Sequence, residues 1–131
     1  MLYYFIRKKP RLPQKIEMKL NQEDKRRFPR IKLKTPIYYR VRGKQEFNHS
    51  LTEDISEGGV ALTNEGYIAP FTNLMLEIRI LSQILAPVGR VAWASPIAHS
   101  NRYRVGVEFM QLEPQKTDYL REYIELQRNN L

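Results

Sequence analysis

Apolar and polar residues alternate in short runs through the middle of this chain. The clearest run spans residues 74–80, where every second side chain is apolar, and residues 102–110 repeat the pattern. An apolar period of two is typical of a strand that buries one face. Glycine, proline and asparagine separate further runs of this kind. The pattern therefore predicts six short strands: residues 33–41, 47–55, a strand from 60 onward, 74–80, 84–94 and 102–110.

The period changes near the C-terminus, where a helix is expected. Pro114 suits the first turn of a helix, and Leu120, Tyr123, Ile124 and Gln127 follow at helical spacing. Leu120 and Ile124 would pack on the body of the domain. The residues predicted to face water are Arg121, Glu122, Glu125 and Arg128.

The start of the chain lacks this regularity. Residues 1–24 have no sustained apolar period, so we expect an extended N-terminal arm that is disordered or serves as an interaction segment. Residues 25–32 are basic, and Pro29 disfavours helix at the residue before it, which predicts a loop. The expected fold is all-β: one domain at residues 25–131, a six-stranded antiparallel β-barrel with a C-terminal α-helix. Barrel closure removes the exposed edges of an open sheet.

Composition excludes several kinds of chemistry. The chain of 131 residues contains no cysteine, which excludes disulfides and thiolate metal sites and is compatible with the cytoplasm that we expect. His49 and His99 lie far apart without metal-like spacing, so no metal is expected. No paired carboxylates form a recognisable site, and no histidine accompanies a nucleophile. The chain is therefore predicted to bind a ligand rather than to act as an enzyme.

The net charge of +8 favours anionic partners, which include nucleotides, nucleic acid and acidic membranes. Much of the excess lies before residue 45, which favours an anion site formed by the N-terminal region. The apolar start at residues 2–6 is too short to cross a bilayer, and we expect no transmembrane segment. Followed by basic residues 7–9, it is suited at most to weak contact with an anionic membrane surface.

Two short motifs carry the candidate chemistry. Arg26 and Arg30 form R-x-x-x-R, while Asp54, Ser56 and Gly59 form D-x-S-x-x-G. Arginine presents a planar fork to phosphate or to guanine O6 and N7, and it stacks on bases. Aspartate accepts from guanine N1–H and N2–H, and serine reaches phosphate. Alone, each motif has an ordinary interpretation, as a solvated basic run or a turn between strands. Their joint occurrence favours a site for a guanine-containing phosphodiester.

Together with two later segments, these motifs resemble the PilZ domain, the bacterial receptor module for cyclic di-GMP. The segments are Gly89–Trp93, similar to the family's G-x-V-x-W strand, and Arg104–Phe109, similar to its R-V-G-V-x-F strand. The resemblance runs from about Lys25 to the last helix. It implies a six-stranded barrel with an arginine-bearing N-terminal segment that folds over the ligand. It also implies a non-enzymatic role in second-messenger signalling, in motility, exopolysaccharide synthesis or adhesion during biofilm regulation.

The resemblance assigns the ligand to the residues of the two motifs. Arg26 and Arg30 would take phosphate and the guanine Hoogsteen edges, and Asp54 a guanine Watson–Crick edge. Ser56 would hold a phosphate or amide position, and Gly59 would let the turn approach the ligand. Candidate secondary contacts are Lys25, Arg27 and Arg90, with the number of bound ligands left open. Trp93 is expected at the barrel surface or beneath the final helix, not against guanine.

Two alternatives stay open at this point. A basic barrel with Tyr38, Tyr39 and Phe47 on its strands suits nucleic acid, although the charge is concentrated near the N-terminus and there is no regular aromatic ladder. A PilZ-like adaptor without ligand would act by protein contact alone, but the intact motifs argue against it. We therefore expect cyclic di-GMP and an effector protein as partners, and no nucleic acid.

Overall fold

The structure is a computed structural model that describes residues 28–130. The predicted arm at residues 1–24, and the predicted ligand contacts Lys25, Arg26 and Arg27, lie outside the described residues. The elements are β1 (Arg30–Lys32), β2 (Pro36–Val41), β3 (Phe47–Ser56), β4 (Gly59–Asn64), β5 (Asn73–Ile80), β6 (Gln83–Leu85), β7 (Val88–Pro96), β8 (Tyr103–Gln111) and α2 (Pro114–Asn129).

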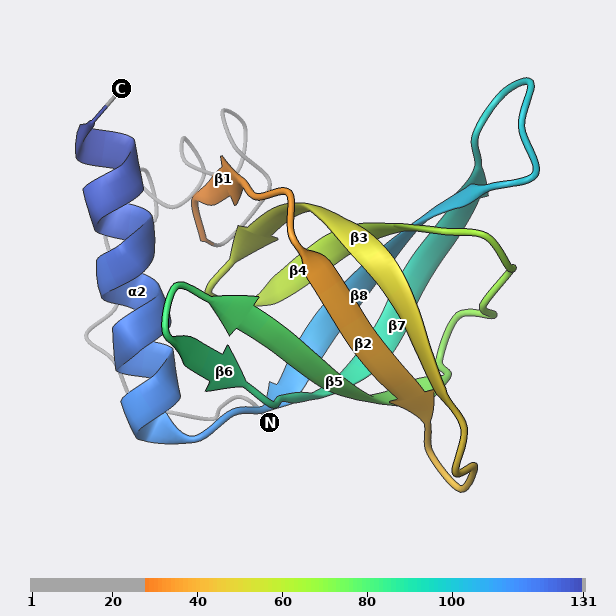
Figure 1. The fold of residues 1–131 in the computed structure, drawn as a ribbon, viewed down its shortest axis with the longest axis horizontal. Helices are drawn as coiled ribbons and strands as arrows, with labels where there is room; N and C mark the ends of the chain where they lie inside the picture. The colour runs from red at the N-terminus through yellow and green to blue at the C-terminus, as the bar shows by residue number, and fades with distance from the viewer. Residues whose placement is uncertain (1–27, 131) are drawn as a thin grey trace, which may run out of the picture.

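Six of these strands form a closed antiparallel barrel, which confirms the predicted fold class (Figure 1). Around the barrel the order is β3, β2, β5, β7, β8 and β4, and the pairing of β3 with β4 closes the ring. The two remaining strands are short additions: β1 pairs with β3, and β6 pairs with β5. Closure gives every ring strand a partner on both sides, although residues 47–50 of β3 extend past β4 and pair with β2 alone.

Three differences from the predicted strands are larger than a shift of one residue. Residues 25–32 were expected as a loop, but Arg30–Lys32 form β1 because they pair with the last three residues of β3. The single strand expected at residues 84–94 is two strands, β6 and β7, which pair with opposite ends of β5. The strand expected from residue 33 begins at Pro36.

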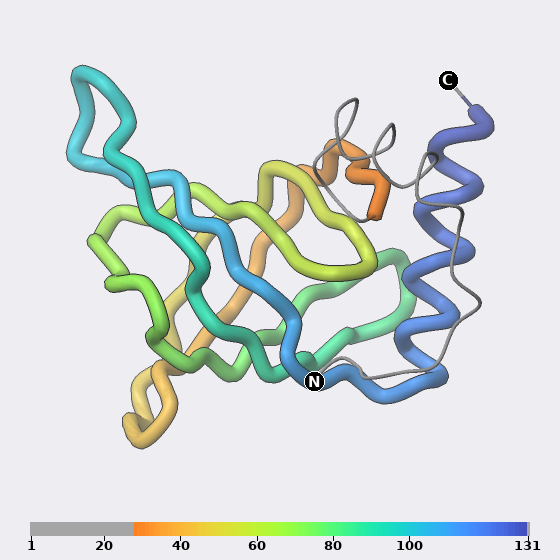
Figure 2. Tube along the Cα trace, turned by 180° about the vertical axis from the view of Figure 1, so that it is seen from behind, coloured from red at the N-terminus to blue at the C-terminus, as the bar shows by residue number. Residues whose placement is uncertain are grey.

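Buried aliphatic residues fill the barrel. The alternating side chains predicted to share one face of β5 are all at most 2% exposed: Leu74, Leu76, Ile78 and Ile80. The helix α2 covers one end of the barrel, as seen from behind in Figure 2, and buries Leu120 and Ile124 as predicted. The Tyr119 hydroxyl donates to the Ile80 carbonyl at 3.0 Å, which ties the helix to β5. Within residues 28–130, no helix is long and apolar enough to span a membrane.

Candidate nucleotide-binding site

Strand register brings three predicted ligand residues into one transverse row on the outside of the barrel. Arg30 of β1 lies opposite Ser56 of β3, which lies opposite Gly59 of β4. The row continues through Glu108 of β8 to Arg90 of β7. We call it the Arg30 row. Arg90, predicted only as a secondary contact, thus lies at the far end of the row that contains both motifs, where it forms a 3.7 Å ion pair with Glu108.

A second outward row runs beside the first. Between them lies a row of buried core residues: Ile31, Ile55, Val60, Val107 and Val91. The second outward row, which we call the Trp93 row, consists of Lys32, Asp54, Ala61, Gly106 and Trp93. Because side chains alternate along a strand, the two outward rows lie about 7 Å apart. Small residues occupy the central positions, of which Gly59, Ala61 and Gly106 are buried, and charged and aromatic side chains lie at the sides.

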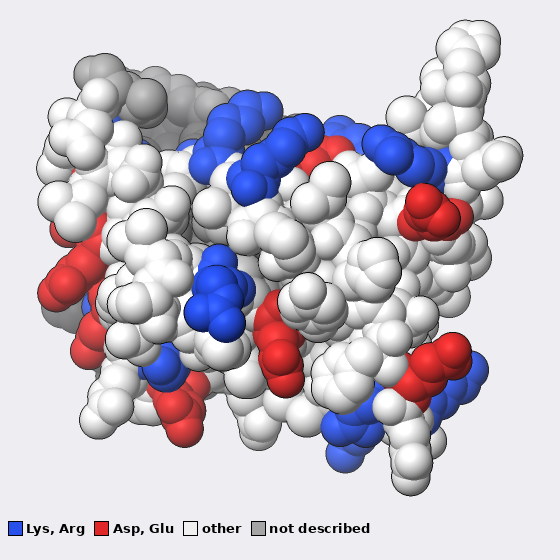
Figure 3. All heavy atoms as spheres, viewed as in Figure 1, with Lys and Arg blue, Asp and Glu red and all other residues white. Residues whose placement is uncertain are grey.

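Arg30 and Asp54 contact each other across the two rows. The Arg30 Nη1 donates to Asp54 Oδ1 at 2.6 Å, and the two side chains are 28% and 19% exposed. Lys32, on the same short strand, lies opposite Asp54. Basic side chains line this upper edge of the molecule, near β1 (Figure 3). The site therefore holds an acceptor and a guanidinium side by side, with further guanidinium N–H groups left for a ligand.

Hydrogen bonds to the Ser56 side chain and to β8 hold the turn between β3 and β4. The Ser56 Oγ accepts a hydrogen bond from the Gly58 N–H at 3.1 Å, and the Gly58 carbonyl accepts one from Phe109 N–H at 2.9 Å. Phe28 lies against Gly58, where an added Cβ would come within 2.9 Å of its ring. A Cβ at Gly59 would collide with the Val107 carbonyl oxygen. Gly59 is therefore required for the close approach of β4 to β8, a constraint beyond its predicted role at the ligand.

Trp93 lies flat over the strand beside it. A Cβ at Gly106 would collide with the indole, so only glycine lets the ring lie there. The Arg104 guanidinium is 5.8 Å from the ring centroid, and Trp93 remains 40% exposed. The prediction of a barrel-surface position is confirmed, and the ring lies in the same row as Asp54.

A neighbouring ion pair holds Arg104 in place. Its Nε donates to Glu53 at 2.8 Å, and the Thr63 hydroxyl donates to the same carboxylate at 2.6 Å. Burial raises the pKa of Glu53, but the hydrogen bonds from Thr63 and Arg104, with the charges of Arg104 and Lys32, outweigh it and leave that pKa below its usual value. Glu53 is therefore charged at neutral pH.

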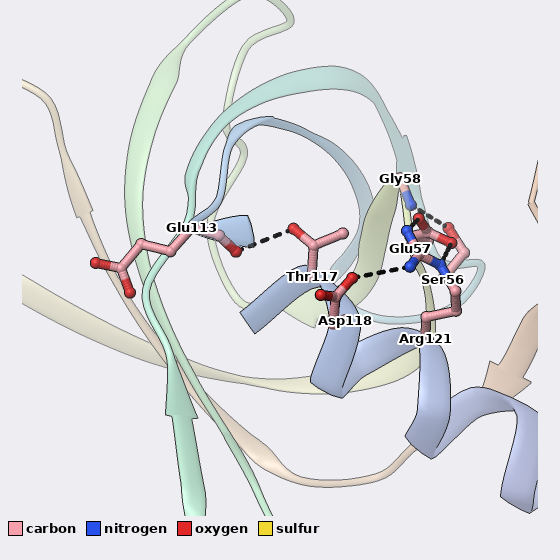
Figure 4. Close-up of polar contacts among 7 residues, drawn as sticks. All are labelled: Ser56, Glu57, Gly58, Glu113, Thr117, Asp118 and Arg121. Carbon is pink, nitrogen blue, oxygen red and sulfur yellow. Dashed lines mark hydrogen bonds and ion pairs between the residues drawn. The ribbon is translucent and has the colours of Figure 1, made fainter. Parts of the chain in front are cut away.

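The structure also shows a contact that the sequence-based reasoning missed. Arg121 of α2 faces water as expected, with its side chain 48% exposed, but it also donates to both carboxylate oxygens of Glu57, at 3.2 and 2.6 Å, and to Asp118 at 2.9 Å (Figure 4). Glu57 lies inside the D-x-S-x-x-G motif, at a position where the motif specifies no residue. The negative charge of Glu57 was the only feature of the sequence that pointed to an ion pair at this position.

The opposite end of the barrel carries the aromatic residues considered for nucleic acid. Tyr38 and Phe47 are about half exposed and border a groove of about 850 Å³. Tyr39 is buried, and its hydroxyl donates to Asn64 at 3.2 Å, so it offers no stacking face. Burial raises the pKa of Tyr39, and the Asn64 hydrogen bond partly offsets this. The described residues include no cluster of three or more acidic or histidine side chains that could hold a metal ion.

Comparisons with known proteins agree with the barrel fold. The family model described as "PilZ domain" matches residues 24–126 of this chain. A search of curated proteins found no match.

Several solved structures share the fold. The Bacillus subtilis inhibitor of motility (MotI/DgrA) matches with a TM-score of 0.72 and 18% identity, covering 80% of this chain and 52% of that one. YcgR from Escherichia coli in complex with c-di-GMP matches with a TM-score of 0.65 and 16% identity, covering 80% and 47%. The PilZ domain of YcgR with c-di-GMP matches with a TM-score of 0.62 and 17% identity, covering 82% and 95%. This chain thus spans about half the length of the first two proteins and nearly all of the isolated domain.

Proposed function

This chain belongs to the PilZ domain family, and from that membership together with the geometry of the two outward rows we propose that it is a receptor for cyclic di-GMP. The observation that carries the proposal is the placement of Arg30, Asp54, Ser56 and Gly59 on adjacent strands, with Arg30 and Asp54 partly exposed and Ser56 and Gly59 buried beside them. Residues that are 24 to 29 positions apart in the sequence thereby become neighbours. Two of the structural neighbours, from Escherichia coli, were solved with c-di-GMP.

In this proposal, Arg30 and Asp54 exchange their mutual contact for contacts with the ligand. Arg30 turns its fork to a phosphate and the Hoogsteen edge of a guanine, and Asp54 accepts from that base's Watson–Crick edge. Hydrogen bonds to charged groups contribute about 1.5–3 kcal/mol each. The existing ion pair keeps both side chains near their working positions before ligand arrives. This reduces the entropy lost on binding.

The other end of the Trp93 row supplies a surface for base stacking. The indole lies flat on Gly106 and is 40% exposed, so a guanine placed over the small central residues reaches its edge or face. Stacking of a base on an aromatic ring contributes about 1–3 kcal/mol. This assigns Trp93 to the ligand, a role that the sequence alone did not favour.

Arg26, with Lys25 and Arg27, completes the phosphate contacts from the segment before β1. Ligand binding draws this segment onto the barrel and changes the surface that an effector protein contacts. Arg90 neutralises a phosphate from the far side, since it lies in the same row as Arg30 and Ser56. The protein acts by binding alone, without catalysis.

The test is a calorimetric titration of the full chain with cyclic di-GMP. We expect saturable binding by the wild type and at least a tenfold loss of affinity in Arg30→Ala and Asp54→Ala. The matched controls are Arg79→Ala and Glu77→Ala, exposed charged residues on β5. Both controls should bind as the wild type does.

Two results would contradict the proposal. Wild-type protein that ignores cyclic di-GMP at high micromolar concentration would exclude the receptor role. Equal binding of a linear guanine-containing RNA, with the steep salt dependence of phosphate contacts, would favour the nucleic-acid alternative.

A further inference from the structure

The ion pair between the β3–β4 turn and helix α2 plays no part in the proposed contacts with the ligand. We propose that Arg121 is a positioning residue of the dinucleotide site: by holding Glu57 it fixes the Ser56–Gly59 turn, and it couples ligand binding to the docking of α2. This inference rests on the proposed function, because it concerns the same site.

The geometry of Glu57 supports a positioning role. Its side chain is 19% exposed, so the carboxylate has lost much of its contact with water and needs a partner. Arg121 meets both oxygens with Nε and Nη2 at 3.2 and 2.6 Å, the fork arrangement that gives arginine–carboxylate pairs their directional strength. Figure 4 shows the pair joining the turn to the helix. Asp118, one turn earlier on α2, orients the same guanidinium at 2.9 Å.

The link from Glu57 to the ligand residues is short. Glu57 lies between Ser56 and Gly58, and the Gly58 N–H donates to the Ser56 hydroxyl oxygen at 3.1 Å. A shift of the Glu57 backbone therefore moves the donor that orients this hydroxyl. Ser56 in turn lies opposite Arg30 in the Arg30 row. Loss of the helix contact should loosen the ligand side of the turn without removing any ligand-binding group.

Helix α2 has other anchors, so the pair with Glu57 is not what holds it on the barrel. Leu120 and Ile124 are buried, and Tyr119 and Lys116 bond to Ile80 and Gln83. The helix contacts β1 and β3, the two strands that carry Arg30, Asp54 and Ser56. A variant at position 121 is therefore expected to fold with α2 docked. Because coupling is reciprocal, a ligand that fixes the turn should also make local opening of the docked helix α2 less frequent.

The experiment measures cyclic di-GMP affinity by calorimetry for the wild type, Glu57→Gln, Arg121→Gln and the double variant. We expect each single variant to bind about fivefold more weakly, and the double variant to lose about fivefold rather than the roughly 25-fold of independent effects. Arg121→Lys, which keeps the charge without the fork, should be intermediate. The matched control is Arg128→Gln, an exposed arginine two turns further along the helix with no ion pair to the described residues.

Amide hydrogen exchange supplies a second measurement that is independent of affinity. Saturating cyclic di-GMP should slow exchange in the first half of α2 in the wild type and in Arg128→Gln, but not in Arg121→Gln. If Arg121→Gln does not fold, the same affinity and exchange measurements on Arg121→Lys test the proposal instead.

The outcomes separate this inference from the proposed function. If the wild type binds, but Arg121→Gln and Glu57→Gln bind equally well or their losses multiply, the positioning role is wrong and the receptor role stands. If cyclic di-GMP does not change amide hydrogen exchange in α2 of the wild type, the proposed coupling between the ligand and the helix is also wrong. If the wild type itself does not bind, the proposed function fails and takes this inference with it.

Discussion

The two ends of strand β3 are built in different ways. Its last residues, Asp54–Ser56, are paired on both sides, with β1 and β4, whereas Phe47–Ser50 are paired with β2 alone. Ser56 is 4% exposed and Asp54 has an ion-pair partner, while Phe47 is 53% exposed beside an open groove. One strand therefore provides a constrained polar surface at one end and an open aromatic groove at the other.

This difference explains why the ligand motif lies where it does. A charged ligand is bound well only if donors and acceptors are held in place before it arrives, since ordering them afterwards costs binding energy. Pairing on both sides fixes the backbone of Asp54 and Ser56, and the pair between Glu57 and Arg121 fixes the turn that follows. The open end of β3 lacks such support on one side.

The largest expected effect concerns the glycines near the two ends. Gly59→Ala would place a Cβ against the Val107 carbonyl, and neither paired strand can move away, so we expect a loss of about 3 kcal/mol in unfolding free energy. Gly66→Ala, in the loop beside the groove, meets only the Asn64 amide at 3.8 Å and should change stability by less than about 0.5 kcal/mol. Urea denaturation of both variants measures this. Equal losses of unfolding free energy in the two variants would mean that both ends tolerate an added Cβ equally well, which would contradict the comparison.

A smaller effect is expected at Thr52, where β3 passes from one end to the other. Its hydroxyl donates to Leu33 at 2.5 Å and accepts from the Thr35 N–H at 2.9 Å, and the residue is fully buried. Thr52→Val keeps the shape but leaves these backbone groups unpaired, so it should cost about 2 kcal/mol. Ser50→Ala, at the open end, should cost less than about 1 kcal/mol because water can replace its bond to Thr63. Thermal melts measure both variants, and a Ser50→Ala variant that is less stable than Thr52→Val would contradict this comparison.

Ligand affinity tests the comparison from the functional side. Trp93→Ala should weaken cyclic di-GMP binding about tenfold, which corresponds to about 1.4 kcal/mol of lost stacking. Tyr38→Ala removes an aromatic ring next to the groove that is slightly more exposed, at 48% against 40% for Trp93, and should change affinity less than about twofold. Calorimetry distinguishes the two. A larger loss of affinity in Tyr38→Ala than in Trp93→Ala would indicate that the ligand binds in the groove and not at the proposed site.

The smallest effect depends on pH. The pKa of Glu53 is lowered from 4.5, so its stabilising contribution is complete above that value and is lost as pH falls through the lowered folded-state pKa. Glu53→Gln should therefore be less stable than the wild type at pH 7, by less than about 1 kcal/mol, with the difference shrinking below pH 4.5. Melting curves across this range measure it. A difference that grows toward acid pH would contradict the assigned direction.

Much of the barrel could be predicted from local patterns. The alternation at residues 74–80 located β5 and its buried face, and the spacing of Leu120 and Ile124 located the buried face of α2. β1 could not be predicted in this way, since three residues beside a proline carry no period of their own. They form a strand because the end of β3 offers a free partner. The split between β6 and β7 likewise depends on which end of β5 each segment meets.

The sequence by itself determined the family, the barrel and the residue types at the site, because motif spacing and the period of two are local properties of the chain. Only the tertiary structure decided which way several of these residues face. Bulges at Glu53 and Ala92 each insert one residue into a strand, so Thr52 turns inward and Trp93 turns outward, against simple alternation. The tertiary structure also decided the partner of Arg121, since a helix pattern cannot predict a carboxylate on a distant turn. Such contacts depend on strand register and closure, which involve residues far apart in the sequence.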